Sequence, residues 1–339
     1  MMARLGLWTR YKLRLRRRRL LWRGFRSRHQ LNRIKDLTAE IAPGDILLFA
    51  TVRNEAIRLP YFLEHYRRLG VSHFLIVDND STDDTAAVLT AAPDVSFWHT
   101  TAGYKDARFG MDWLMWLLIR HGHGHWTITV DADELLVYPD HDSRPLPHLT
   151  AWLEQQGQEM MGATMLDLYP KGSPDAQRYT PGQNPCDVLN WFDGYGYWAQ
   201  RQPKMDNLWL QGGARARCFF ADEPRRAPTL NKIPLVKWNR RYVFVNSTHN
   251  ALPRRLNRIY DAPGREKVSG VLLHTKFLPG VSDRAREEQS RQQHFSNSEQ
   301  YDTYYHALAE NPDLWDEQSI AYRGWQQLVD LRLMSRGSW

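Results

Sequence analysis

The sequence predicts an α/β protein with a mainly parallel sheet flanked by helices. Between residues 46 and 130, strand-like and helical segments alternate, and the strand-like segments are short, largely apolar runs. Such alternation is typical of right-handed βαβ crossovers, and unbroken apolar runs are typical of parallel strands covered on both faces. The 339 residues suffice for one large domain or two ordinary ones, and 42% hydrophobic residues can form a substantial core.

The first 35 residues form a basic segment with 13 Lys or Arg and no acid, whereas the remaining 304 residues carry a net charge of −6. We expect this segment to be helical to about Lys35. Five apolar side chains recur at spacings of three, four and seven and share one stripe: Trp8, Tyr11, Leu15, Trp22 and Phe25. A basic helix with aromatic residues on one side can lie on an anionic membrane. A solvated helix, or one that packs on the body, is the alternative.

Four strands and three intervening helices are expected next. The strands are residues 46–52, 74–77, 95–98 and 126–130, and the helices are residues 59–69, 83–92 and 107–120. Pro60 and Gly70 favour the bounds of the first helix, and Pro93 ends the second.

Polar clusters follow three of these strands. They are Arg-Asn-Glu at 53–55, Asp-Asn-Asp-Ser-Thr-Asp at 78–83 and Asp-Ala-Asp-Glu at 131–134. Carboxyl ends of parallel strands meet at one sheet edge, where open α/β sheets bind ligands. Asp131 and Asp133 can share a hard divalent cation with substrate phosphate oxygens. Capping of the next helix is the alternative for either acid.

The pattern is weaker beyond residue 138. A helix is expected at 151–156 and strands at 162–168, 242–245 and 271–274. Residues 170–230, rich in Pro, Gly, Tyr and Trp, are expected to be long loops that form a binding surface, and the chain from 283 onward is helical and charged. The only cysteines, Cys186 and Cys218, indicate no disulfide framework and fit a reducing compartment.

Residues 45–140 resemble the nucleotide-sugar-binding half of GT-A glycosyltransferases, and more closely the glycosyltransferase family 2-like group of bacterial proteins. The three polar clusters carry this resemblance, which extends more loosely to about Phe277. It implies a GT-A-like (Rossmann-like) fold. It also implies metal-dependent transfer of a sugar from a nucleotide-sugar to a glycan or lipid-linked acceptor, in bacterial surface polysaccharide synthesis.

The resemblance implies roles for individual residues. The loop after the first strand and the acid after the second would hold the nucleoside; the matching residues are Arg53, Asn54, Glu55 and Asp78. Many members have a second acid where this chain has Asn79, whose amide can bond a base edge. The resemblance further implies that Asp131 and Asp133 reach a Mn²⁺ or Mg²⁺ ion on the donor diphosphate. Such an ion would neutralise charge on the leaving group.

Two histidines, His249 and His274, are candidates for a third metal ligand because each follows a strand-like run. Relatives often supply a late His to the metal and a nearby basic residue to the phosphates, and His274 with Lys276 resembles that pairing better. A core histidine is the alternative for each. Arg108 and Asp112 begin the third helix near the same sheet edge and could contact the sugar, or pair with each other at i, i+4.

An inverting transfer needs a general base for the acceptor hydroxyl. Asp193 and Asp167 are the candidates, and the sequence does not choose between them. The alternatives to a glycosyltransferase are a nucleotidyltransferase and a non-catalytic nucleotide- or sugar-binding protein on the same scaffold. A nucleotidyltransferase would usually have a Gly-rich phosphate loop where residues 53–55 stand.

Four parts are therefore expected: a basic helical arm (1–40), a nucleotide-sugar-binding half (41–140), an acceptor or catalytic half of the same domain (141–282) and C-terminal helices (283–339). No apolar run reaches transmembrane length, and Arg16–Arg19 interrupt any signal-peptide core. We expect a cytoplasmic protein, with the inner face of the cell membrane as a candidate surface for residues 1–35 and no nucleic-acid partner. Removal of the arm is expected to impair membrane binding and not folding.

Overall fold

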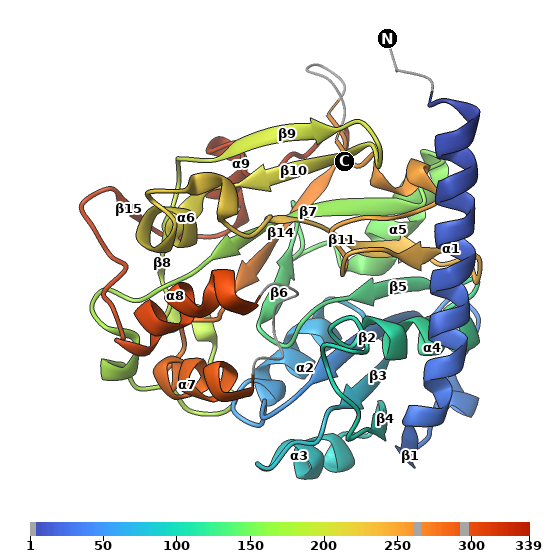
Figure 1. The fold of residues 1–339 in the computed structure, drawn as a ribbon, viewed down its shortest axis with the longest axis horizontal. Coiled ribbons are helices and arrows are strands. Elements are labelled where there is room, and N and C mark those ends of the chain that lie inside the picture. Colours follow the sequence, from blue (N-terminus) through green and yellow to red (C-terminus); the bar gives the residue numbers. More distant parts are fainter. Residues whose placement is uncertain (1–4, 261–265, 292–297) are drawn as a thin grey trace.

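A nine-stranded sheet forms the centre of the computed structural model, which describes residues 5–260, 266–291 and 298–339 (Figure 1). The strands lie in the order β1 (Asn32–Lys35), β4 (Val95–His99), β3 (His73–Asp78), β2 (Ile46–Val52), β5 (Trp126–Thr129), β11 (Asn231–Lys237), β7 (Met160–Asp167), β14 (Ser269–His274) and β6 (Glu134–Val137). β4, β3, β2, β5, β7 and β14 run in one direction, and the other three run against them. The predicted α/β class with a mainly parallel sheet is confirmed.

The strand order reverses beside β2. The chain passes from β2 outward to β3 and β4, then crosses back to place β5 on the other side of β2. Where the connections after two neighbouring parallel strands lead to opposite sides, a crevice opens at the carboxyl ends of these strands. Ligands of open α/β sheets bind in such a crevice. Residues 53–55 follow β2 and residues 131–134 follow β5, so two of the predicted polar clusters meet at this crevice.

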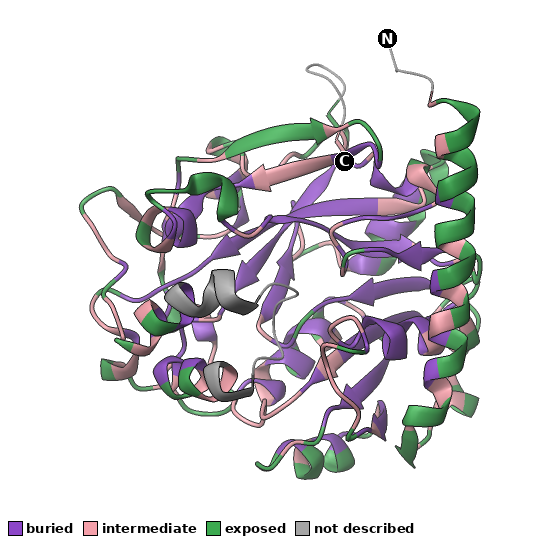
Figure 2. Cartoon of the chain, viewed as in Figure 1, coloured by how far each residue is buried: buried purple, intermediate pink, exposed green. Residues whose placement is uncertain are grey.

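Helices cover both faces of the sheet (Figure 2). α2 (Leu59–Arg68), α3 (Thr85–Ala91) and α5 (Leu146–Gln155) pack on one face, while α4 (Met111–His121) and α1 (Leu7–Ser27) lie on the other. Successive side chains of β2 enter the two cores in turn, because strand side chains alternate between faces. Leu48 and Ala50 belong to the core under α2, whereas Leu47 and Phe49 belong to the core under α4.

The second half of the chain adds short elements around the sheet (Figure 1). They are β8 (Trp191–Asp193), β9 (Trp198–Gln202), β10 (Asn207–Gln211), α6 (Gly213–Phe219), β12 (Val243–Phe244), β13 (Ala251–Leu252), α7 (Val281–Arg291), α8 (Ser298–Ala309), β15 (Ser319–Ala321) and α9 (Trp325–Asp330). Single turns of 3-10 helix occur at Arg28–Gln30, Thr38–Glu40, Pro174–Ala176, Pro185–Asp187, Pro224–Arg226 and Arg254–Asn257. The expectation of loops throughout 170–230 was therefore wrong for β8, β9, β10 and α6.

Three strands of the central sheet, β1, β6 and β11, were not predicted. β6 begins at Glu134, directly after Asp131 and Asp133. These two acids therefore lie in the turn between two strands, whereas the sequence predicts only a strand before them. β11 contains Pro234, which cannot donate to a sheet ladder and argues against a central strand. The register of β11 against β7 shifts between Lys232 and Leu235, and this irregularity accommodates the proline.

The basic segment is joined to the body. Its helix ends at Ser27, and residues 32–35, expected to be helical, form the edge strand β1 paired with β4. Gly24 lies against Met115, and the Ser27 hydroxyl donates to the carbonyl of Asp112 over 2.7 Å. Removing residues 1–36 would expose the apolar side of α4 and one edge of the sheet, contrary to the expectation that folding does not depend on them.

The contact between α1 and α4 can be tested at Gly24. A Cβ atom there would lie 2.9 Å from the Cβ of Met115, so Gly24→Val must push the helices apart. We expect the free energy of unfolding in urea to fall by roughly 1–3 kcal/mol, as for other overpacked sites. Gly6→Val is the matched control, because a Cβ at Gly6 meets no atom within 4 Å. Equal stability of the two variants would contradict close packing of α1 on α4.

Candidate functional site

A cavity of about 670 Å³ lies at the crevice where the strand order reverses. Its volume falls within the roughly 300–1,000 Å³ of known ligand pockets. Nine of the predicted site residues line it: Arg53, Asn54, Glu55, Asn79, Asp131, Asp133, His249, His274 and Lys276. The other five, Asp78, Arg108, Asp112, Asp167 and Asp193, do not form its wall.

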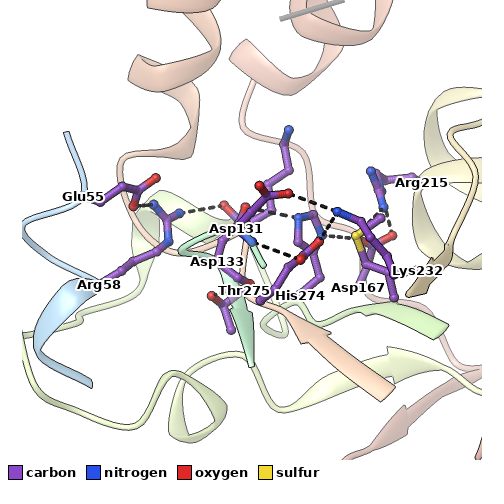
Figure 3. Close-up of polar contacts among 12 residues, drawn as sticks. Glu55, Arg58, Asp131, Asp133, Asp167, Arg215, Lys232, His274 and Thr275 are labelled. Atoms are coloured by element: carbon purple, nitrogen blue, oxygen red, sulfur yellow. Dashed lines mark hydrogen bonds and ion pairs between the residues drawn. The ribbon is translucent and has the colours of Figure 1, made fainter. Parts of the chain in front are cut away.

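His274, which lines this cavity, lies between two carboxylates (Figure 3). It ends β14, where the strand register sets it beside Asp167 of β7 and Glu134 of β6. Its Nδ1 is 2.6 Å from Oδ1 of Asp167, and its Nε2 is 3.1 Å from Oδ2 of Asp133. Burial opposes a charge on the ring, but Asp133 and Asp167 outweigh it and raise the pKa of His274 above its usual value.

The two carboxylates are themselves held in place. Nε of Arg215, on α6, donates to Oδ2 of Asp167 over 2.8 Å, and together with His274 it lowers the pKa of Asp167 to about 2 despite burial. The backbone N–H of Thr275 donates to the carbonyl oxygen of Asp133 over 2.7 Å. Burial would raise the pKa of Asp133, but His274 outweighs this effect and holds it well below the usual value. Asp133 and Asp167 are therefore both ionised beside the imidazole.

Lys232 neutralises the first acid of the pair. It lies on β11 with only 5% of its side chain exposed, and its Nζ is 3.1 Å from Asp131 and 2.8 Å from Glu134. Burial opposes the charge, but the two carboxylates hold the pKa of Lys232 above its usual value. Asp131 is 54% exposed and faces Lys232, whereas Asp133 faces His274.

The donor set fits a divalent ion at Asp133 and His274. A carboxylate and an imidazole suit Mn²⁺, and a carboxylate behind the other ring nitrogen is the usual support of a metal-binding histidine. Asp167 supplies that support through Nδ1. Asp131 is turned to Lys232, and within the described ranges no three His, Cys, Asp or Glu side chains already surround one point as metal ligands. The arrangement is thus a two-residue core with Asp131 as a further carboxylate nearby.

A second charged group stands across the cavity from Lys232. Nη1 of Arg58 lies 2.6 Å from the carboxylate of Glu55, and only 4% of the Arg58 side chain is exposed. Burial raises the pKa of Glu55 in spite of this pair. Arg284, on α7, donates to the carbonyls of Leu278 and Pro279, and burial together with Arg58 lowers its pKa to about 10.

The residues expected to hold the nucleoside form a bonded loop cluster. Arg53 donates from Nη1 to the carbonyls of Asn79 and Asp80, each over 2.8 Å. Asn54, at φ 52°, accepts from the backbone N–H of Thr82. Asn79 donates its amide to the carbonyls of Thr100 and Ala102, and Asp78 is turned away from the cavity to accept from Ser81. Asp78 and Asn79 therefore fix the loops around this end of the cavity.

Three other predicted residues serve the surrounding structure. Nε of Arg108 is 2.6 Å from Asp112, and Nη1 donates to the carbonyls of Phe244 and Val245, so this pair joins α4 to β12. His249 lines the cavity, but its Nδ1 is 2.7 Å from the carbonyl of Asn231, and burial together with Lys232 lowers its pKa to about 3. His249 is thus a neutral wall residue.

Asp193 lies in a separate depression. Nε and Nη2 of Arg217 donate to its carboxylate over 2.8 and 2.9 Å, and the hydroxyl of Tyr169 donates to it over 2.5 Å. Asp167 is enclosed by Arg215 and His274. Neither of the two acids expected as general base is therefore presented to the cavity.

The cavity wall is positive although the body is acidic. Eight Arg or Lys and six Asp or Glu line it, whereas residues 36–339 as a whole carry a net charge of −6. Three buried hydroxyls on this wall, those of Thr51, Thr129 and Thr248, have no hydrogen-bond partner within the described part of the chain. Buried polar atoms are almost always bonded, so a water molecule or a ligand is expected to supply the missing partner.

Sequence reasoning did not identify Arg58, Arg215, Lys232 or Arg284. Lys232 lies in β11, which was not predicted as a strand because it contains Pro234. A single buried lysine also belongs to no sequence motif. Arg58 follows the first polar cluster by three residues, at the spacing of a helical ion pair with Glu55, and that spacing was the one available signal.

No protein-family model matches the sequence, and no curated protein matches it. Among solved structures, a mannosyltransferase from Pyrobaculum calidifontis in complex with GDP-Man and Mn²⁺ aligns over 88% of this chain and 81% of its own, at 16% identity and a TM-score of 0.33. Glucosyl-3-phosphoglycerate synthase from Mycobacterium tuberculosis, in complex with Mn²⁺, UDP and phosphoglyceric acid, aligns over 39% and 46%, at 16% identity and a TM-score of 0.24. A 4-diphosphocytidyl-2C-methyl-D-erythritol synthase aligns over 41% and 66%, at 18% identity and a TM-score of 0.25. The chain thus spans less than two thirds of the length of the last two proteins. Similarity at these TM-scores does not assign a function to the chain, so its function must be inferred from the geometry of the site.

Lys232 should be the most stability-sensitive lysine of this site. Lys232→Met would leave Glu134, whose side chain is 1% exposed, without its cation, and such losses cost roughly 3–5 kcal/mol of unfolding free energy. Lys237→Met is the control, because its partner Glu154 is 50% exposed and such pairs contribute less than about 1 kcal/mol. Urea denaturation measures both. Adding Glu134→Gln to Lys232→Met should recover much of the loss, and a Lys232 variant as stable as the control would contradict the buried pair.

Proposed function

We propose that this chain is a metal-dependent glycosyltransferase that moves a sugar from a nucleotide-sugar to a glycan or lipid-linked acceptor, as in the synthesis of bacterial surface polysaccharide. The observation that carries the proposal is the position of His274 between Asp133 and Asp167 at one edge of the sheet. Asp133 and His274 line a cavity with a positive wall, inside an otherwise acidic body, and Asp167 supports His274 from outside this wall. A nucleoside diphosphate sugar is an anion of suitable size for such a cavity.

The residues of the cavity divide into groups with different roles. Asp133 and His274 would hold Mn²⁺ or Mg²⁺, with Asp131 as the further carboxylate. Bound there, the ion would act as a Lewis acid on the leaving diphosphate. Lys276 and Arg284 supply positive charge on the same wall and would bind phosphate oxygens. The loop cluster of Arg53, Asn54, Glu55 and Asn79, supported by Asp78, would enclose the nucleoside.

Asp167 has a supporting role in this scheme. Because it is ionised and bonded to Nδ1, it holds the His274 ring with Nε2 directed at Asp133. Arg215 in turn prevents Asp167 from turning away. The three side chains therefore preorganise the ion site without a contribution from the ligand.

Nucleotide binding should depend on the metal and on Asp133. Isothermal titration with UDP and with GDP should show binding in the presence of Mn²⁺ that weakens on its removal. Asp133→Asn and His274→Ala should each reduce Mn²⁺-dependent affinity by roughly 10–100-fold or more. Asp142→Asn, an exposed carboxylate outside the cavity wall, is the matched control and should bind as the unchanged protein does. Equal affinity with and without metal, or an unaffected Asp133→Asn variant, would overturn the metal assignment.

We further propose that α1 holds the protein on an anionic membrane surface. Its buried residues, Leu13, Leu20, Gly24 and Ser27, face the body. Six apolar side chains remain exposed, namely Leu7, Trp8, Tyr11, Leu15, Trp22 and Phe25. At about 100° per residue the centres of the two sets lie roughly 180° apart. Arginines flank the exposed stripe, as in helices that lie in the interface of a bilayer.

An interfacial position agrees with the remaining features of α1. Within the described part of the chain, no helix is both long and apolar enough to cross a bilayer. Each basic residue near an anionic surface contributes about 1 kcal/mol, screened within a Debye length. A few of the 13 basic residues would therefore offset the repulsion of the acidic body.

The stripe can be tested without removing α1. Trp8→Ser with Trp22→Ser should lower co-sedimentation with phosphatidylserine-containing liposomes by roughly tenfold or more, because each buried aromatic side chain contributes about 1.5–3 kcal/mol at most. High salt should weaken binding of the unchanged protein. Tyr195→Ser, at an exposed aromatic outside α1, is the control and should sediment normally. Absence of binding by the unchanged protein, or no effect of the double substitution, would leave α1 as a solvated basic helix.

A further inference from the structure

A second, smaller depression of about 250 Å³ lies beside the cavity on the other side of α6. It is formed by the loop after β8, the first residue of β9, α6 and the segment before β15. Its lining residues include Asp193, Tyr195, Trp198, Arg217, Asp316 and Gln318. None of these residues lines the main cavity.

The depression gathers exposed aromatic surface. Among the described residues after position 35, the large hydrophobic side chains that remain exposed are Tyr195, at 69%, and Trp198, at 38%. Both line this one depression. Aromatic side chains that remain in water at one place mark a contact site more often than isolated exposed residues do.

Charged side chains on the same wall are fixed by one another. Arg217 donates twice to Asp193, and its Nη1 lies 3.0 Å from Asp316, so one guanidinium holds two carboxylates. Asp193 is 12% exposed, while Arg217 and Asp316 are 34% and 39% exposed and retain polar atoms toward solvent. Such a network presents hydrogen-bonding groups in a fixed arrangement, which reduces the ordering cost of binding.

Glycine sets the shape of the adjacent wall. A Cβ at Gly212 (φ 131°) would lie 2.2 Å from the carbonyl oxygen of Gly196, and one at Gly213 (φ 70°) would lie 2.9 Å from the hydroxyl of Tyr197. The chain segments after β8 and before α6 therefore pack backbone to backbone. A side chain cannot be accommodated there without moving the loop that carries Tyr195.

We infer that this depression binds a sugar ring of the acceptor chain. A pyranose has apolar C–H faces and a rim of hydroxyl groups. Tyr195 and Trp198 offer flat apolar surfaces for the faces, and Asp316, Arg217 and Gln318 offer acceptors and donors for the rim. Aromatic lining with a few placed polar groups is the composition of small-molecule sites in general.

Residues adjacent in the chain line the depression and the proposed active site. Pro224 lines the depression, and the next two residues, Arg225 and Arg226, line the main cavity. The residues of α6 divide in the same way, with Arg215 on the cavity wall and Arg217 in the depression. A chain of several sugars could thus place its growing end in the cavity and an earlier ring on Tyr195 and Trp198. The inference rests on the proposed function and names its acceptor class as an oligosaccharide.

Binding of unmodified sugars tests this subsite apart from catalysis. Without donor or metal, the protein would be titrated calorimetrically with maltohexaose, cellohexaose, laminarihexaose and mannohexaose, and with the monosaccharide of each. We expect at least one hexasaccharide to bind more tightly than its monosaccharide. Tyr195→Ala and Trp198→Ala should each weaken that binding by roughly tenfold, the upper end of what one aromatic contact contributes.

Matched controls separate the subsite from the fold and from the active site. Tyr11→Ala, at an exposed aromatic of α1, should leave oligosaccharide binding unchanged, and circular dichroism should show all three variants folded. Mn²⁺-dependent UDP or GDP binding should be unaffected in the Tyr195 and Trp198 variants. Absence of binding by every hexasaccharide, or equal binding by these variants and the unchanged protein, would overturn the inference. Sugar binding without any nucleotide binding would instead overturn the proposed transferase and leave the subsite standing.

Discussion

The position of His274 between Asp133 and Asp167 is the interaction on which the rest of the site depends. Buried charges are costly unless each has partners, and an unpaired carboxylate here would destabilise the carboxyl edge of the sheet. The chain meets this requirement with cations from other elements: Arg215 from α6 for Asp167, and Lys232 from β11 for Asp131 and Glu134. The acids at the strand ends therefore determine which residue types the neighbouring strands and helices must carry.

Elements with local signals could be predicted from the sequence, and elements fixed by distant contacts could not. β2, β3, β4 and β5 are apolar runs, and polar clusters follow three of them. Their parallel direction and the meeting of residues 53–55 with 131–134 at one sheet edge therefore follow from βαβ topology. β11 lies between β5 and β7 although more than 60 residues separate it from either along the chain, and its Pro234 contradicts local strand propensity. The carboxylates were accessible to sequence reasoning because they follow strands. Their cations were not, because Lys232 and Arg215 reach them by tertiary packing alone.

The charge division of the sequence has a structural counterpart in α1. One face of this helix completes the core over α4 through Leu13, Leu20 and Gly24, which explains why a segment so basic is nevertheless ordered. The Arg23 guanidinium meets Asp112, which also accepts from Arg108, so the body supplies acid where the helix approaches it. On the opposite face Phe25 contacts the ring of Trp116 on α4, whereas Trp8 and Trp22 remain 66% and 58% exposed. A helix with two apolar faces and charged flanks is suited to pack on a folded body with one face and on a lipid bilayer with the other, as proposed above.

The two acids expected as general base have a different common property. Asp167 and Asp193 are the anchors of α6, because Arg215 binds the first and Arg217 binds the second. Residues two apart on a helix project about 200° from each other, so the two arginines leave α6 on opposite sides. One side faces the cavity with the proposed ion site, and the other faces the depression with Tyr195 and Trp198. A displacement of α6 would therefore loosen the support of His274 and the wall of the depression together. The geometry of the proposed sugar subsite is in this way tied to the geometry of the proposed ion site.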